Sequence, residues 1–262
     1  MIKADSHLHS WHSVDSTCPM EDIVLKAIEL GLEEITFTEH VEHDGRPGAE
    51  FDYEKYFEGI AQMREKYGDK IRIKAGIEFG LQTHTIELFW DDLKKYEFDL
   101  IILSAHSVRG QHIASGEYAA GKTQEELHHI YYENTLQMMR EFKNYSVLGH
   151  VDYIKRYDEH GEYSDDHIAE VVGKIFHQAI ADGKGIEVNT SSFKYNMPDL
   201  TPSRRLLQLY YDLGGRIITI GSDAHNTEYV ADHFEEIKEV LKEIGFTEIC
   251  TFEKMEPVFH KL

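Results

Sequence analysis

The sequence predicts an α/β fold in which seven parallel strands close into a TIM-like barrel. Short apolar strands alternate with amphipathic helices, a pattern typical of a parallel sheet with right-handed crossovers. Seven strand candidates occur in the 262 residues. Almost every one ends in a side chain that binds metals. This favours a closed barrel, because an open sheet gathers its ligands mainly at one switch point.

The strand candidates are short apolar runs spread over the whole chain. They are Ile2–Ser6, Glu34–Thr38, Ile71–Ile77, Asp99–Ala105, Ser146–Gly149, Gly185–Asn189 and Arg216–Gly221. Segments 20–28, 168–179 and 234–244 between and after them carry apolar residues at the spacing of a helix buried on one side. Left-handed helix ends are expected at Gly31, Gly183, Gly214 and Gly245. No linker or repeat interrupts the chain, so we expect one domain over residues 1–262.

The composition argues against several classes of protein. A formal net charge of −21 disfavours nucleic acid as a partner, although bound cations can still attract a small anionic substrate. No apolar run is long enough to cross a membrane, and the first residues lack the apolar stretch of a signal peptide, so a cytoplasmic location is expected. Cys18 and Cys250 are expected to be free thiols. Neither begins a Cys-x5-Arg loop, which argues against a phosphatase with a cysteine nucleophile. No Asp-x-Asp motif occurs, which argues against a phosphatase of the haloacid-dehalogenase type.

Histidines and carboxylates stand at the strand ends, where a barrel brings side chains together. His7 and His9 end the first strand, and Asp223 and His225 follow the last one. Residues two apart on a strand point to the same side, so His7 and His9 can bind one ion. The strands between end at His40, Glu78, His106, His150 and, more weakly, Asn189.

Among these residues, Glu78 is the candidate for a bridging ligand. A carboxylate has two oxygens that can bind two cations, whereas an imidazole cannot bridge in this way. Nitrogen and carboxylate ligands without a thiolate suit zinc, manganese or iron. Sites with several such ions mostly hydrolyse phosphate or amide bonds.

Together these motifs resemble the polymerase-and-histidinol-phosphatase (PHP) family along nearly the whole chain. They occur in the family's order as His7-x-His9, Asp15, Thr38-Glu39-His40, Gly76-Ile77-Glu78, Ser104-Ala105-His106, Gly149-His150 and Ser222-Asp223-Ala224-His225. Segments 152–157 and 187–191 look like the family's stand-alone histidinol-phosphate phosphatases. The resemblance implies a distorted seven-stranded (β/α) barrel and hydrolysis of L-histidinol phosphate in histidine biosynthesis.

The resemblance also implies three divalent metal ions, each with its own ligands. The expected set is His7, His9, Glu78 and Asp223 for the first ion, Glu78, His106 and His150 for the second, and Asp15, His40 and His225 for the third. Asp15 enters through the resemblance, because the pattern alone places it in a loop. Catalytic roles are expected for Glu78, Asp223 and His225.

The expected substrate-binding residues are Arg156, Lys194, Asn189 and Arg109. Arg156 and Lys194 would bind the phosphate opposite the ions. The subgroup usually carries an arginine where this chain has Lys194, and a lysine is a point charge without the bidentate fork. Arg109 is either a substitute cation or a solvated loop residue.

Three other interpretations stay open at the level of sequence. An amidohydrolase-type barrel uses a similar ligand order, but it leaves Asp15, His40 and His225 without a role. A phosphoesterase of this type can act instead on another small phosphate ester, a nucleotide, an oligonucleotide end or a phosphotyrosine protein, and the net charge weakens the nucleic-acid version. A metal-stabilised interaction module without catalysis would normally have lost ligands, and none is missing. Metal identity and oligomeric state are not determined by the sequence.

Overall fold

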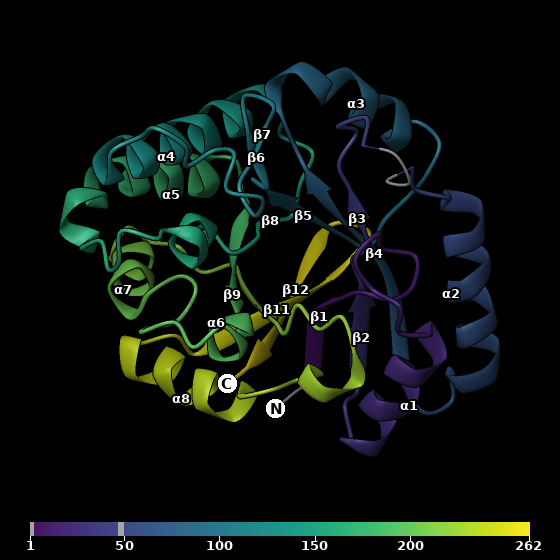
Figure 1. Ribbon diagram of the computed structural model, residues 1–262. Coiled ribbons are helices and arrows are strands. Elements are labelled where there is room, and N and C mark those ends of the chain that lie inside the picture. Colours follow the sequence, from purple (N-terminus) through teal and green to yellow (C-terminus); the bar gives the residue numbers. More distant parts are fainter. Residues whose placement is uncertain (1–2, 47–49) are drawn as a thin grey trace.

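The computed structural model describes residues 3–46 and 50–262, and its centre is a ring of parallel strands (Figure 1). Along the ring the order is β1-β2-β4-β5-β8-β9-β10, and every pairing in it is parallel. These strands are Ala4–Leu8, Glu34–Phe37, Arg72–Gly80, Leu100–Ser104, Val147–Leu148, Gly185–Asn189 and Ile218–Gly221. The predicted seven-stranded barrel is confirmed. Ile2, the predicted start of the first strand, lies outside the described residues.

The ring closes between its first and last strands at the carboxyl end. The amide of Asp223 donates to the carbonyl of His7 at 2.8 Å, and the amide of His9 donates to the carbonyl of Ala224 at 2.9 Å. Because these bonds join the segments that follow the two strands, His7, His9 and Asp223 are held beside one another. The register of β1 with β2 is also shifted between Asp5 and Leu8, which distorts the barrel at this point.

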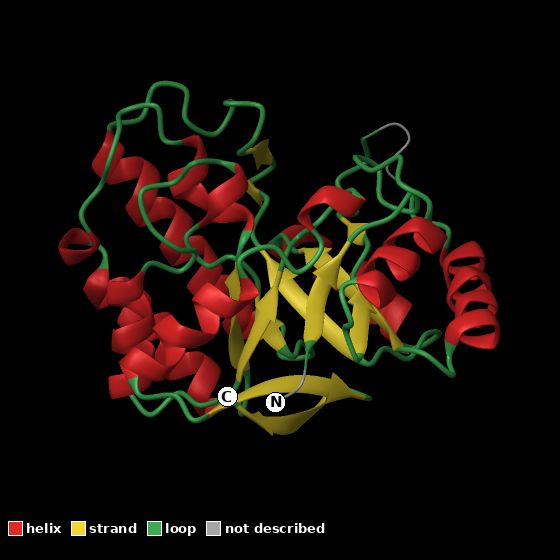
Figure 2. Cartoon of the chain, turned by 90° about the horizontal axis from the view of Figure 1, so that it is seen from below, coloured by secondary structure: helices red, strands yellow, loops and turns green. Residues whose placement is uncertain are grey.

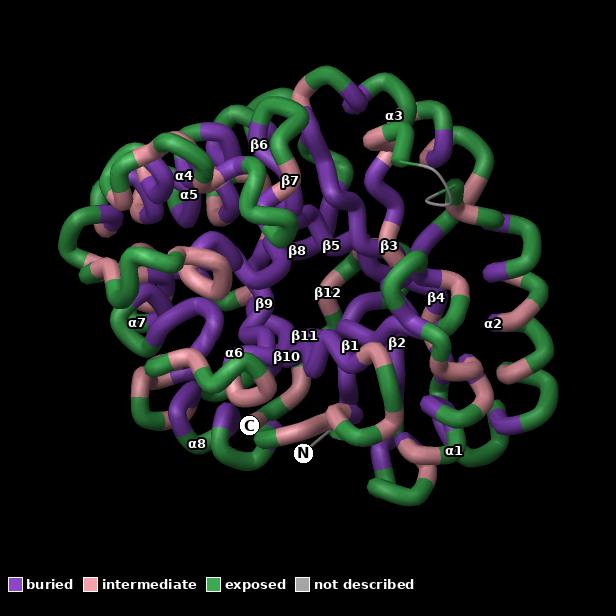
Figure 3. Tube along the Cα trace, in the orientation of Figure 1, coloured by how far each residue is buried: buried purple, intermediate pink, exposed green. Residues whose placement is uncertain are grey.

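Eight α-helices of the described chain surround the barrel and bury their apolar sides against it (Figures 1 and 3). They are α1 Met20–Glu29, α2 Tyr53–Tyr67, α3 Ile86–Leu93, α4 Gln124–Glu141, α5 Ala169–Ala181, α6 Ser191–Lys194, α7 Arg204–Asp212 and α8 Phe234–Ile244. The three helices expected from apolar spacing correspond to α1, α5 and α8. The four glycines predicted at helix ends all have positive φ. None of the helices described is long and apolar enough to cross a membrane.

A C-terminal hairpin, absent from the predicted elements, lies across the amino end of the barrel (Figure 2). It consists of β11 (Glu248–Glu253) and β12 (Glu256–Lys261). Cys250 and Phe252 of β11 pack against Leu100, Ile102 and Val147 of the barrel strands. The hairpin therefore covers the end opposite the predicted metal ligands. Both cysteines are free, as expected.

Three short strands lie near the carboxyl end. β3 (His40–Val41) pairs with β4 and continues the line of β2 after a break at Thr38 and Glu39. β6 (Ser107–Val108) and β7 (Gln111–His112) form a small hairpin after β5. The break before β3 matters because it directs His40 toward Glu78, the residue with which it is paired in register.

Candidate metal centre

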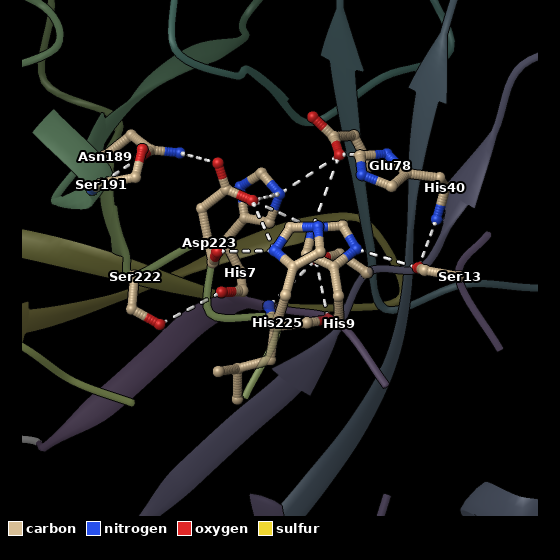
Figure 4. Close-up of polar contacts among 12 residues, drawn as sticks. His7, His9, Ser13, His40, Glu78, Asn189, Ser191, Ser222, Asp223 and His225 are labelled. Carbon is tan, nitrogen blue, oxygen red and sulfur yellow. Dashed lines mark hydrogen bonds and ion pairs between the residues drawn. The ribbon is translucent and has the colours of Figure 1, made fainter. Parts of the chain in front are cut away.

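Four predicted ligands from β1, β4 and the β10 end meet around one point (Figure 4). The Nε2 atom of His7 lies 3.3 Å from Glu78 Oε2 and 3.6 Å from Asp223 Oδ1. The Nε2 atom of His9 lies 3.6 Å and 3.2 Å from the same two oxygens. Ligands about 2.1 Å from a tetrahedral ion are about 3.4 Å apart. The four side chains thus have the spacing of a single coordination sphere.

A second set forms on the other oxygen of Glu78. Glu78 Oε1 lies 3.3 Å from His106 Nε2 and 2.9 Å from His150 Nε2, and the two nitrogens are 3.4 Å apart. These three residues can hold a second ion. Glu78 therefore faces one set with each oxygen, which is the arrangement a bridging carboxylate requires.

The third predicted set lies nearer the surface. Asp15 Oδ2 is 3.5 Å from His40 Nε2 and 3.2 Å from His225 Nε2. The Nδ1 atom of His225 donates to the carbonyl of Asp223 at 2.9 Å, because a carbonyl oxygen can only accept. A neutral His225 ring consequently has its lone pair on Nε2, the atom facing Asp15. The His40 ring also reaches Glu78 Oε2 through Nδ1, at 2.8 Å.

Unpartnered polar atoms test whether cations fit this cluster. His7 Nε2 and His9 Nε2 are buried and make no hydrogen bond in the described structure, and Glu78 Oε2 has only ion-pair contacts with histidine rings, the shortest with His40. Such groups are costly to bury unless something binds them. A divalent ion between them would satisfy all three at once. The donor set, its spacing and its orphaned atoms therefore fit metal binding.

Buried carboxylates behind the cluster orient the imidazoles, and sequence analysis did not assign them. Glu187 accepts from His7 Nδ1 and Glu42 accepts from His106 Nδ1, both at 2.6 Å. A hydrogen bond on the far nitrogen of a ligand histidine fixes its tautomer and orientation. The sequence offers only weak signals for these two carboxylates: Glu187 is two residues before Asn189 on the same strand, in the segment 187–191 noted above, and Glu42 follows two residues after His40.

His9 is oriented through a hydroxyl instead. Its Nδ1 atom lies 3.0 Å from Ser13 Oγ, and this hydroxyl donates to Glu39 Oε2 at 2.6 Å. Ser10 donates to Glu39 as well, through both its amide and its hydroxyl. Glu39 thus fixes the loop that follows β1, and with it the position of Asp15 further along that loop.

The electrostatics of the cluster favour positive charge. Burial by itself lowers the pKa of His106, but the carboxylates Glu42 and Glu78 raise it to about 10. Burial raises the pKa of Asp15, and the hydrogen bonds from His225 and His40 outweigh it and hold that pKa well below the usual range. Buried carboxylates of this density need cations beside them, either protons or metal ions.

A cavity of about 340 Å³ opens above the cluster and is lined by three cationic side chains, Arg46, Arg156 and Lys194, of which Arg46 is paired with Asp44. Arg156 lies between the rings of Tyr153 and Tyr195, with its guanidinium carbon 5.0 Å and 4.1 Å from their centroids. Its side chain is 6% exposed, and its Nε atom has no hydrogen-bond partner. The Lys194 ammonium stands 5.1 Å from the centroid of the Tyr229 ring. Both residues line the cavity, where an anionic group would meet them.

The two other expected substrate-binding residues lie elsewhere. Asn189 is fully buried at the end of β9 and is not among the residues that line the cavity. Its amide nitrogen lies 3.1 Å from Glu187. The same nitrogen lies 3.4 Å from Asp223 (Figure 4). Arg109 is exposed in the turn between β6 and β7 and does not line the cavity either.

Comparison with known proteins agrees with this geometry. A PHP domain model matches residues 5–191. The chain belongs to the PHP family. Two similar members are the histidinol-phosphatase of Lactococcus lactis (32% identical over 98% of this chain and 96% of that protein) and the probable histidinol-phosphatase of Thermotoga maritima (31% identical over 92% of each).

A solved PHP structure also superposes on this one. It is the histidinol phosphate phosphatase of Lactococcus lactis in complex with zinc, L-histidinol and phosphate. The TM-score is 0.88 at 31% identity, and 98% of both chains is covered. The agreement over the full length extends beyond the matched PHP segment, so α7, β10 and α8 belong to the same fold as the rest.

Proposed function

We propose that this chain is a metal-dependent phosphomonoesterase that hydrolyses L-histidinol phosphate to L-histidinol and phosphate in histidine biosynthesis. It acts as a single domain over residues 1–262 with three divalent ions of zinc, manganese or iron. The observation that carries the proposal is the buried Glu78, which presents one oxygen to each of two ligand sets. The full-length similarity to histidinol-phosphatases supports the substrate.

The ligands are proposed as predicted from the sequence. His7, His9, Glu78 and Asp223 hold the first ion, Glu78, His106 and His150 the second, and Asp15, His40 and His225 the third. When bound, such ions supply Lewis-acid chemistry, since they polarise phosphoryl oxygens and lower the pKa of bound water to about 7. Phosphate monoesters need this help, because their uncatalysed hydrolysis is extremely slow.

The chain's own residues bind and orient the ester. Arg156 presents its guanidinium to the phosphate from between two tyrosine rings, which keep it from turning away. Lys194 adds a second positive charge from α6. Together they fix the phosphorus over Glu78, so that a water oxygen can form its bond to phosphorus in line with the P–O bond that breaks to release the alcohol. These side chains then balance part of the phosphate's negative charge with groups that are already in position.

The leaving alkoxide requires a proton. The Nδ1–H group of His225 donates a hydrogen bond to the carbonyl of Asp223, and the Nε2 atom of the same ring faces Asp15. His225 therefore suits the role of ligand, and it donates a proton only if Nε2 is protonated first. Asp223, whose Oδ1 lies 3.2 Å from His9 Nε2, orients the nucleophile side of the site.

The amidohydrolase alternative is the weaker one for this geometry. It gives no role to Asp15, His40 and His225, yet His40 Nε2 and His225 Nε2 both lie within 3.5 Å of Asp15 Oδ2. The cationic pair Arg156 and Lys194 also matches a dianionic substrate better than a neutral amide or lactone.

The test is phosphate release by the purified, metal-analysed protein from L-histidinol phosphate, beside a panel of sugar phosphates, nucleotides, phosphotyrosine, amides and lactones. The proposal predicts that kcat/KM is highest for L-histidinol phosphate. Preferential hydrolysis of another phosphate ester would support the phosphomonoesterase activity but contradict L-histidinol phosphate as the substrate. Hydrolysis of amides or lactones alone would overturn both.

A further inference from the structure

Glu187 is a fully buried carboxylate on β9 that touches two ligand segments at once. Its Oε1 atom accepts from His7 Nδ1 at 2.6 Å. Its Oε2 atom accepts from the amide of His150 at 3.0 Å and from the side-chain amide of Asn189 at 3.1 Å. Both carboxylate oxygens therefore accept hydrogen bonds, one at Oε1 and two at Oε2.

The barrel interior is shaped to hold this carboxylate in one place. A Cβ atom added at Gly221 would lie 2.3 Å from Glu187 Oε1 and 2.4 Å from the Cβ of His7. A Cβ atom at Gly149 would lie 3.6 Å from Glu187 Oε2. The space beside Gly221 is thus occupied by the glutamate itself, which leaves its side chain little freedom.

A chain of hydrogen bonds continues from Glu187 to the cationic side of the cavity. Arg156 Nη2 donates to Ser191 Oγ, and Ser191 Oγ donates to Asn189 Oδ1. The amide nitrogen of Asn189 then donates to Glu187. Figure 4 shows Asn189 beside Ser191 with its amide directed toward Asp223. In this series of hydrogen bonds each group donates toward the next one, so the donors point in a single direction from Arg156 to Glu187.

From these contacts we infer that Glu187 is a positioning residue for two parts of the site, the metal ligand His7 and the cationic residue Arg156. It holds His7 in the tautomer with the proton on Nδ1, so that the Nε2 lone pair faces Glu78 and Asp223. Through Asn189 and Ser191 it also holds Arg156 in the cavity wall. The inference rests on the metal site and the phosphatase activity proposed above, and it adds a residue that contacts neither metal nor substrate.

A glutamine at this position keeps the shape but cannot satisfy the same partners. If its oxygen accepts from His7, its NH₂ group meets the two donors from His150 and Asn189. If it is turned around, its NH₂ group faces His7 Nδ1, and the ring must carry its proton on Nε2 instead. The second arrangement removes the lone pair that a metal needs. Loss of such an outer partner typically costs 10- to 100-fold in metal affinity.

The experiment compares zinc binding by Glu187→Gln and wild type, with the NMR comparison made on the zinc-loaded proteins, and no substrate is required. Zinc affinity is measured by chelator competition, and the protonated nitrogen of His7 is identified by ¹⁵N NMR. We expect a 10- to 100-fold weaker tightest zinc site and a His7 signal moved toward the Nε2-protonated form. Unchanged affinity together with an unchanged His7 tautomer would overturn the inference.

Glu34→Gln is the matched control. Glu34 is also a buried carboxylate on a barrel strand, but it lies at the amino end of β2 and pairs with Arg72. It should leave zinc affinity and the His7 signal unchanged. If Glu187→Gln does not fold, Glu187→Asp takes its place, because the shorter side chain keeps the charge and withdraws it from His7. Unchanged affinity in that variant would equally contradict the inference.

Ser191→Ala separates the effect of Glu187 on Arg156 from its effect on His7. It removes the link to Arg156 and leaves the bond from Glu187 to His7 intact. We expect unchanged zinc affinity with an increased KM for L-histidinol phosphate. An equal loss of zinc affinity in Ser191→Ala and Glu187→Gln would show a general structural effect and overturn the inference. If no variant, nor wild type, hydrolyses the ester while Glu187→Gln still weakens zinc binding, the proposed function fails and the metal-positioning role stands.

Discussion

Replacing Arg156 by alanine tests the phosphate side of the site without touching a proposed ligand. The side chain is 6% exposed, so solvent screens its charge little, and its nearest proposed ligand oxygen, Asp223 Oδ2, is 3.9 Å away. A hydrogen bond to a charged group contributes about 1.5–3 kcal/mol. We therefore expect kcat/KM for L-histidinol phosphate to fall by roughly 10- to 150-fold, mainly through KM, with metal content unchanged.

The assay is steady-state phosphate release beside elemental analysis of the same preparations. Arg156→Lys is the informative companion, because it keeps the charge and loses the planar fork that stacks between Tyr153 and Tyr195. Its activity should lie between those of the alanine variant and wild type. Unchanged kinetics in Arg156→Ala would refute the phosphate-binding role, and a parallel loss of metal would mean that Arg156 acts on the ligands instead.

Three further perturbations follow from the same structure. Glu78→Ala should lose bound metal and activity together, and retained metal with full activity would remove it from the site. Gly221→Ala should lower the free energy of unfolding by about 1–3 kcal/mol in urea denaturation, because its methyl group would overlap Glu187. Gly173→Ala, at an open position in α5, should instead be neutral or slightly stabilising. Burial lowers the pKa of His128, so the unfolded chain binds a proton first as the pH falls below about 6.5. The midpoint of thermal unfolding should therefore fall more steeply between pH 7 and pH 5 in wild type than in His128→Gln, and parallel curves would contradict this.

The strand ends were predictable because one rule connects sequence position to spatial position in a barrel. His7, Glu78, His150 and Asp223 are far apart in the chain, but each ends or follows a parallel strand, and such ends share one face. Glu78 as the bridging candidate followed from chemistry, since only a carboxylate has two oxygens to offer. Ile2, at the predicted start of the first strand, stays outside the described residues.

Which side chains form hydrogen bonds with one another inside the barrel could not be predicted in the same way. That Glu187 accepts from His7, 180 residues away, depends on which strands become neighbours and on the space left at Gly221. The C-terminal hairpin was also missed. Its strand β12 carries the exposed residues Val258 and Phe259, so it shows little of the buried alternation that marks a strand. Asn189 ends its strand as predicted, but its amide contacts Glu187 and Asp223, and the residue does not line the cavity.

The central claim is that distant histidines and carboxylates gather divalent ions that this chain uses to hydrolyse a phosphate ester. The most direct measurement is a titration of chelator-treated protein with zinc or manganese, with phosphate release from L-histidinol phosphate followed at each addition. We expect no phosphate release without metal, and an activity that rises with added metal and saturates near three ions per chain. Full activity in protein that elemental analysis finds free of metal would contradict it.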